Sequence, residues 1–120
     1  MVLPEQDMFE ELKHRLRKFA EARDWDQFHS PKNLSMALIA EAAELVEHFQ
    51  WLTEEQSAQL PPDKLKEVET ELADILIYLI RMADKLEVDL EKAVKNKIDL
   101  NEKKYPAAQV RGSAKKYNEY

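Results

Sequence analysis

Apolar side chains recur every three or four residues in four segments of this chain, and this spacing predicts four α-helices. Successive residues of a helix are separated by about 100°, so the repeat gathers the apolar side chains on one face. The helices are predicted over residues 5–22, 31–51, 64–86 and 90–104. Because the chain contains one glycine, sheets joined by tight glycine turns are not expected. The fold class is therefore predicted to be all-α.

Capping residues mark where several of these helices begin. Ser30 before a proline is a predicted N-cap, and Thr53 opens a capping box that starts a short turn of helix. Asp63 and Asp89 are predicted to cap the third and fourth helices. The small and polar residues from Ala107 onward are predicted to be irregular.

The 120 residues fit one domain, which we predict over 1–110, followed by a polar C-terminal tail over 111–120. The third helix is apolar on much of its circumference across LADILIYLI. A helix of this kind is usually covered from more than one side. In so short a chain we expect a second subunit to supply the extra cover, as in a dimer or a tetramer built from dimers.

The charge and the apolar runs exclude several kinds of partner. The formal net charge is -6 and no basic block is long enough to follow a nucleic-acid backbone, so nucleic-acid binding is not expected. The start of the chain has no secretory pattern, and the longest apolar run, ILIYLI, is too short to cross a bilayer. The chain also lacks cysteine. We therefore expect no membrane partner and a cytoplasmic location.

Two pairs of acidic residues border the apolar stripes of the second and third helices. Glu41 and Glu44 form the first pair, and Glu71 and Asp74 form the second. If these helices pack side by side, the four carboxylates converge without a basic partner and repel one another. Hard divalent cations relieve such repulsion and prefer oxygen ligands, so the pattern favours Mg²⁺. Ordinary surface acids on charged helices are the alternative interpretation.

Several stretches resemble the MazG-like all-α nucleotide pyrophosphohydrolases, namely EAAELVEHFQW, EVETELADILIYLI, KNKIDLNEKKYP and RGSAKKY. The stretches RDWDQFH and FQW resemble the dCTP pyrophosphatase branch of that family. The likeness covers about residues 19–117. It implies a four-helix MazG-like bundle in a homo-oligomer, and a Mg²⁺-dependent hydrolase active in nucleotide pool sanitation. Such an enzyme cleaves dCTP or a modified dCTP between the α and β phosphates, releasing dCMP and pyrophosphate.

The resemblance also implies a role for each group of residues. The family's E-x-x-E and E-x-x-D pairs, which are its metal ligands and catalytic residues, match Glu41, Glu44, Glu71 and Asp74, and Glu44 is our choice of general base. The base pocket matches Trp25, Asp26, Gln27, Phe28, His29, Trp51 and Tyr78. The residues near the phosphates match Lys97, Asn101, Lys104 and Tyr105. Ordinary packing of tryptophans and a solvated basic helix end are the alternatives for the last two groups.

One position departs from the dCTP branch, which carries a histidine where this chain has Leu16. A leucine side chain makes no hydrogen bond, so the base preference stays open.

Two other protein classes are alternatives to this interpretation. A carboxylate-bridged di-iron bundle needs two inward E-x-x-H motifs, and here Glu11 with His14 is the one such pair and His14 points away from the apolar stripe. A non-catalytic helical oligomerisation or interaction module stays open. Metal binding by the four acids separates that module from an enzyme.

Overall fold

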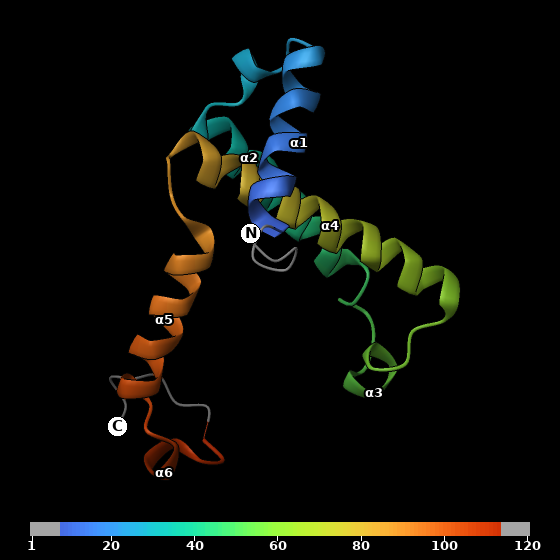
Figure 1. Ribbon diagram of the computed structural model, residues 1–120. Helices are drawn as coiled ribbons and strands as arrows, with labels where there is room; N and C mark the ends of the chain where they lie inside the picture. Colours follow the sequence, from blue (N-terminus) through green and yellow to red (C-terminus); the bar gives the residue numbers. More distant parts are fainter. Residues whose placement is uncertain (1–7, 114–120) are drawn as a thin grey trace. The chain divides into compact units, whose positions relative to one another are not determined.

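The computed structural model describes residues 8–113, and every regular element in this part of the chain is a helix, with no strand (Figure 1). The all-α prediction is thus confirmed. The chain divides into two compact units, Met1–Val88 and Asp89–Tyr120. The predicted boundaries 1–110 and 111–120 stay a prediction, and from residue 114 the predicted tail lies outside the described residues.

The described part of the first unit, from residue 8 onward, holds three long helices and two short ones. In chain order they are α1 (Met8–Ala22), the 3-10 turn η2 (Asp26–Phe28), α2 (Pro31–Glu47), α3 (Glu54–Ser57) and α4 (Pro62–Lys85). The second unit holds α5 (Leu90–Lys104) and α6 (Ala107–Val110). The four predicted main helices are therefore α1, α2, α4 and α5, although residues 5–7 of the first lie outside the described part.

Three of the predicted caps are confirmed by their hydrogen bonds. Ser30 Oγ accepts a hydrogen bond from the Asn33 N–H at 3.1 Å, and Asp89 Oδ1 accepts one from the Lys92 N–H at 3.0 Å. Thr53 and Gln56 form both hydrogen bonds of the capping box, at 3.0 and 3.1 Å.

Three other details of the prediction were wrong. Asp63 does not cap α4, because Pro61 is the N-cap and Asp63 lies in the first turn, where the helix dipole still favours its charge. The second helix ends at Glu47 rather than at Trp51, since the N–H groups of His48 and Phe49 bond to carbonyls three residues back and tighten the chain into a turn. Residues 107–110 form α6 rather than an irregular segment.

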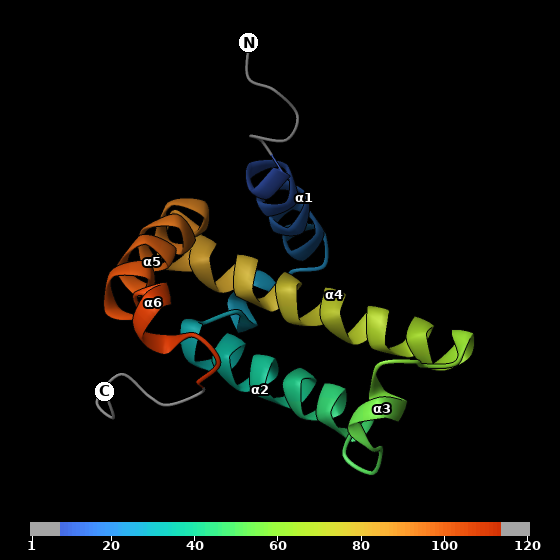
Figure 2. The ribbon, with the colours of Figure 1, turned by 90° about the horizontal axis from the view of Figure 1, so that it is seen from below.

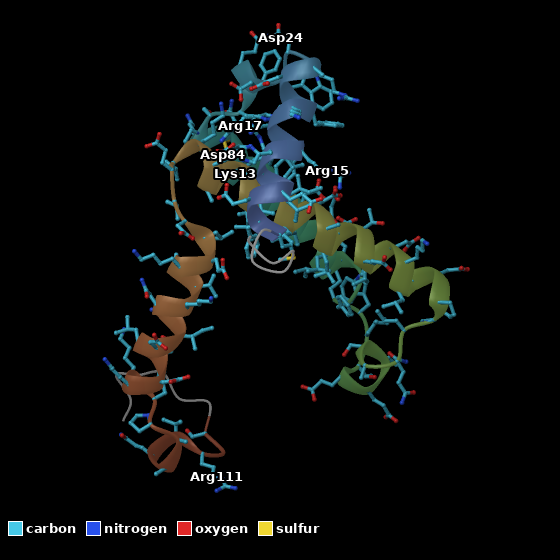
Figure 3. The ribbon with its side chains drawn as sticks, viewed as in Figure 1. Lys13, Arg15, Arg17, Asp24, Asp84 and Arg111 are labelled. Atoms are coloured by element: carbon cyan, nitrogen blue, oxygen red, sulfur yellow. The ribbon has the colours of Figure 1, made fainter. Side chains whose placement is uncertain are left out.

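Helix α4 is the centre of the first unit. It runs antiparallel to α2 along much of its length and carries α1 on another side (Figure 2). Among residues 8–113 the buried apolar side chains are those of Leu34 on α2, Val68 and Ile80 on α4, and Ala20 on α1. An ion pair also joins α1 to α4, because the Arg17 guanidinium donates to both carboxylate oxygens of Asp84 at 2.6 and 3.1 Å (Figure 3).

A second face of α4 remains exposed. Leu65, Leu72, Leu76, Leu79 and Leu86 recur at helical spacing and are 37–54% exposed. Helix α4 is thus apolar on more than one side, as predicted: one apolar face, with Val68 and Ile80, is buried, and the leucine face is exposed. None of the described helices combines the length and the apolar character that crossing a bilayer requires.

We predict that Asp84→Asn lowers the free energy of unfolding at neutral pH by about 2 kcal/mol, because it breaks a charged, two-bond contact between α1 and α4. The Arg17 hydrogen bonds hold the pKa of the Asp84 carboxyl below its ordinary 3.8. A folded-state pKa that is lowered gives stability that is present above the unfolded value and lost as the pH falls through the folded value. The difference between wild type and Asp84→Asn should therefore shrink between about pH 5 and about pH 2.

Urea unfolding across this pH range measures the effect. Glu69→Gln, which changes an exposed acid of the same helix, is the control and should change stability by less than about 0.5 kcal/mol. A difference between wild type and Asp84→Asn that is independent of pH would contradict this account of the ion pair.

Candidate functional site

The antiparallel contact between α2 and α4 brings their acidic residues together. Glu41 and Glu44 lie on α2, and Glu71 and Asp74 lie on α4. One carboxylate oxygen from each of Glu41, Glu44 and Glu71 lies within 4.8 Å of the other two. Asp74 is outside this group of three, one turn along α4 from Glu71. The structure thus brings together three of the four predicted ligands at short range, with the fourth beside them.

The carboxylates of this cluster lack a strong cationic partner among the described residues. Glu41 Oε2 and Glu71 Oε2 are buried and accept no hydrogen bond there. The nearest basic group is His48, whose Nε2 lies 3.8 Å from Glu71 Oε1 and whose Nδ1 lies 3.3 Å from Lys64 Nζ. Buried carboxylate oxygens without donors are costly, so the arrangement needs a positive charge from elsewhere.

The crowding of these carboxyls changes the pKa of Glu41. Burial, followed by contact with the Glu71 and Glu44 carboxyls and by the charges of Glu44 and Asp74, raises the pKa of Glu41 to about 7 from its ordinary 4.5. A carboxyl with such a pKa holds a proton in preference to a charge that its neighbours would repel. The Asp74 contribution also places its charge close enough to act on the cluster.

The donor set fits a hard divalent cation. It consists of carboxylate oxygens from two rigid helices, and no sulfur or imidazole joins the group of three. Two of these residues, Glu41 and Glu71, each have a buried carboxylate oxygen with no hydrogen-bond partner among the described residues. Oxygen ligands of this kind suit Mg²⁺ or another hard ion and disfavour zinc. A bound cation would satisfy the orphan oxygens and favour the ionised form of Glu41.

A cavity of about 470 Å³ opens next to the acids in the same unit. Asp74 lies in its wall, so the cavity adjoins the cluster. Aromatic and apolar side chains from α1, the following turn and α4 provide most of the remaining surface. The lining residues are Leu16, Phe19, Ala20, Trp25, His29, Asp74, Ile77, Tyr78 and Arg81. Its volume and its mixed lining are typical of a small-molecule site.

The end of α1 directs Trp25 toward this cavity. Asp24 adopts a left-handed φ of 54°, and the Trp25 N–H bonds back to the Ala20 carbonyl at 2.9 Å, which is a Schellman-type helix end. Gln27 Nε2 donates to the Asp24 carboxylate and carbonyl, both at 3.0 Å, and this contact supports the turn. Trp25 then meets Phe19 edge to face with ring centroids 5.7 Å apart.

The predicted base-pocket residues separate into two sets. Trp25, His29 and Tyr78 line the cavity, as does Leu16, the position at which the chain departs from the dCTP branch. Asp26, Gln27, Phe28 and Trp51 do not line it. The Asp26 carboxylate is held by Arg81 at 2.8 Å and by Lys85 at 2.6 Å, and these two hydrogen bonds, that of Lys85 first, lower the pKa of Asp26. The Gln27 amide is engaged with Asp24, and the Phe28 ring is exposed.

Trp51 lies at the other end of α2 from Trp25. The 17 residues of that helix span about 25 Å at 1.5 Å per residue. The Trp51 side chain is 87% exposed. One chain therefore does not place both tryptophans on the same small ligand.

The predicted phosphate-side residues lie in the second unit. Lys97, Asn101 and Lys104 recur along one face of α5, and Tyr105 caps its end with its N–H bonded to the Asn101 carbonyl at 2.8 Å. Their roles stay a prediction.

Sequence reasoning missed Arg81, Phe19 and His48. Arg81 follows the apolar run ILIYLI and resembles an ordinary end to a buried stripe. Its spacing was the available signal, because it lies three residues after Tyr78 and seven after Asp74, on the same face of α4. His48 stands four residues after Glu44, which likewise places it on the acidic side of α2.

Comparison with known proteins identifies the family. The sequence model of the MazG-like family matches residues 37–120. The chain is 44% identical to dCTP pyrophosphatase 1 of Mus musculus and 42% identical to the Homo sapiens protein of that name, over 112 residues in each case. The likeness covers 92% of this chain and 66% of each relative, so the chain spans just under two thirds of the relatives' length.

A solved structure shares the fold. The crystal structure of a pyrophosphatase from Archaeoglobus fulgidus is 43% identical, with a TM-score of 0.77, and the likeness covers 81% of this chain and 91% of that one. With this structural neighbour, the relatives and the match of residues 37–120, the chain belongs to the MazG-like family.

Proposed function

We propose that this protein is a nucleotide pyrophosphohydrolase that cleaves a nucleoside triphosphate between its α and β phosphates. The observation that carries the proposal is the convergence of Glu41, Glu44 and Glu71 within 4.8 Å, beside a cavity lined by Trp25 and Tyr78. An acidic cluster next to an aromatic cavity suits a ligand with a phosphate end and a flat end. The names of the relatives, dCTP pyrophosphatase 1 and pyrophosphatase, agree with this activity.

Glu41, Glu44, Glu71 and Asp74 are the proposed metal ligands, and Mg²⁺ is the proposed ion because the donors are oxygens of carboxylates. When bound, Mg²⁺ supplies the positive charge that neutralises phosphate oxygens and makes a water more acidic. The protein's part is to hold these four carboxylates on two packed helices.

Glu44 is the proposed general base. It is the exposed member of the group of three, so water reaches its carboxylate. In the reaction a water oxygen bonds to the α phosphorus, the bond from that phosphorus to the bridging oxygen breaks, and the water proton passes to Glu44. The products are a nucleoside monophosphate and pyrophosphate.

The order of residues along α4 supports a direction for the substrate. Glu71 and Asp74 lie at the acidic cluster, Tyr78 follows one turn later, and Arg81 lies one turn beyond it. We place the triphosphate at the acids and the base in the cavity, where Trp25 and Tyr78 offer aromatic surfaces. Stacking on such surfaces is worth about 1–3 kcal/mol per base.

The preferred base is proposed to be cytosine, as in dCTP or a modified dCTP, with nucleotide pool sanitation as the role. A pyrophosphohydrolase of different base preference is the second candidate, because Leu16 lines the cavity and provides no hydrogen bond. A purely structural oligomerisation module is the third. A structural module does not require buried carboxylate oxygens without hydrogen-bond partners at a helix contact, and these oxygens cost stability.

We also propose a homo-oligomer, either a dimer or a tetramer of dimers. The exposed leucines of α4 need cover, and Trp51 is 87% exposed at the far end of α2 from the cavity. If Trp51 contacts the nucleobase, it does so from a second copy of the chain. Lys97, Asn101, Lys104 and Tyr105 are proposed to contact the phosphates, and a cytoplasmic location stays a prediction.

We predict that turnover depends on a divalent cation held by the four acids. Pyrophosphate release should be seen with Mg²⁺ and abolished by EDTA in a panel of canonical and 5-modified nucleoside triphosphates. Glu41→Gln and Asp74→Asn should each lower kcat by about 100-fold or more, because each removes a ligand that stabilises charge in the transition state. Glu47→Gln is the matched control, because it changes an exposed acid of α2, the helix that carries Glu41.

Release that favours a cytosine nucleotide supports the first candidate, and release spread over other bases supports the second. Full activity in both Glu41→Gln and Asp74→Asn would contradict the assignment of these acids as metal ligands. Absence of release from every nucleotide would leave the oligomerisation module.

The second prediction concerns stability without metal. The raised folded-state pKa of Glu41 gives stability that is present below the unfolded value of 4.5 and lost as the pH rises through about 7. In EDTA, Glu41→Gln should therefore unfold with a free energy about 1 kcal/mol above wild type near pH 8, and with no gain near pH 4. Urea unfolding at both pH values measures this difference. An equal gain in unfolding free energy at both pH values would contradict the raised pKa of Glu41.

The third prediction concerns Trp51. Trp51→Ala should raise KM by about 10- to 100-fold through lost stacking. Mixed oligomers of Glu41→Gln and Trp51→Ala, assayed below the variant's KM, should regain activity, because some sites combine intact acids with a partner's Trp51. Activity no higher than the sum of the two separate variants would show that Trp51 does not complete a neighbour's site.

A further inference from the structure

Arg81 is the one charged side chain that is buried among the described residues, with 3% of its surface exposed. It lines the cavity beside Tyr78 and Trp25. Its backbone belongs to the rigid helix α4, on the face that also carries Asp74. Arg81 is therefore held in the cavity wall by a rigid helix that also carries acids of the cluster.

The guanidinium of Arg81 ties this helix to the turn that follows α1. Its NH2 group donates to Asp26 Oδ1 at 2.8 Å and to His29 Nδ1 at 3.3 Å. These two residues bracket η2, so Arg81 holds the turn at both ends. Its NH1 group reaches Asp84 at 3.4 Å, and Lys85 gives Asp26 a second contact at 2.6 Å.

The contact with His29 also fixes that ring. An arginine N–H only donates, so His29 Nδ1 must accept, and the hydrogen of the neutral ring then lies on Nε2. Burial, and next the Arg81 charge, lower the pKa of His29, which keeps the ring neutral. The cavity wall thus contains an imidazole whose tautomer is set by Arg81.

Stability alone does not account for an arginine at this position. A buried guanidinium is costly to desolvate, and an apolar side chain of similar volume is often neutral or stabilising in its place. Moreover, Arg81 Nε is buried and has no hydrogen-bond acceptor among the described residues. What the arginine provides is geometry, through two charged contacts of fixed direction.

We propose that Arg81 is a positioning residue for the nucleobase: by holding Asp26 and His29 it fixes the Trp25–His29 turn against α4 and so sets the shape and the hydrogen-bonding pattern of the cavity wall. The part of this proposal that concerns nucleotides rests on the proposed function. It accounts for Asp26 and Gln27 at a turn beside the cavity although neither lines it: Asp26 anchors the turn, and Gln27 braces Asp24.

The test compares Arg81→Met with Arg17→Met. Both variants remove a guanidinium that binds Asp84, but Arg17 lies outside the cavity lining, so it controls for loss of stability. For Arg81→Met we expect KM for the preferred nucleotide to rise about 10-fold or more, kcat to change less than about 3-fold, and the preference between bases to narrow. Arg81→Lys should recover part of the loss, since an ammonium keeps one contact with Asp26. Arg17→Met should keep the wild-type KM.

A second readout needs no turnover. The chain has two tryptophans, so in a Trp51→Phe background the fluorescence reports Trp25 alone. Quenching of Trp25 by acrylamide should increase about 2-fold or more in Arg81→Met and stay at the wild-type level in Arg17→Met. If Arg81→Met does not fold, Asp26→Ala removes the acceptor of the same link from its half-exposed end and should shift KM and quenching in the same direction.

The outcomes separate this inference from the proposed function. Unchanged KM and unchanged Trp25 quenching in an active Arg81→Met overturn the inference and leave the proposed function standing. Equal effects in Arg81→Met and Arg17→Met also overturn it, because the effect is then general destabilisation. Wild type that releases no pyrophosphate overturns the proposed function, and the quenching experiment alone then decides whether Arg81 positions the turn.

Discussion

Repulsion between carboxylates at the contact of α2 and α4 is the constraint on which the rest of the site depends. Two helices that pack through apolar stripes normally keep acids at the margins, where water screens them. Here Glu41, Glu44 and Glu71 approach within 4.8 Å, and burial with this crowding raises the pKa of Glu41 to about 7. Burial of apolar side chains on the same two helices, including Leu34 and Val68, offsets the cost of this contact.

Helix α4 organises the whole first unit around that contact. Successive turns of one face carry Glu71 and Asp74, then Tyr78, then Arg81 and finally Lys85. Each turn adds about 5.4 Å, so the face passes from an anionic centre through an aromatic wall to a cationic anchor. The anchor binds Asp26, and the Arg17–Asp84 pair holds α1 against the same end of α4. The charged side chains of this face therefore change from acidic to basic along α4, which separates the acidic cluster from the turn beside the cavity.

Much of the predicted architecture followed from local rules. Periodicity located α1, α2, α4 and α5, and the side chains of Ser30, Thr53 and Asp89 marked three of the helix starts. The errors were also local. Helix α4 begins at Pro62 with Pro61 as its N-cap, so Asp63 is not the cap, and 3-10 hydrogen bonds end α2 at Glu47. Helix ends depend on hydrogen-bond choices that differ by small free energies, which a spacing pattern does not resolve.

The sequence by itself determined the helices, the spacing that puts Glu41 with Glu44 and Glu71 with Asp74, and the family resemblance, from which a role for these acids is predicted. Only the tertiary structure decided which side chains meet. The register of α2 against α4 made three acids converge and left Asp74 at the cavity edge. The turn after α1 brought Trp25 and His29 to that cavity while committing the Asp26 carboxylate to Arg81 and Lys85. The reason is physical: the helical repeat fixes where a side chain points from its own axis, whereas contacts such as Arg81 with Asp26, 55 residues apart, depend on how axes and turns are placed by packing.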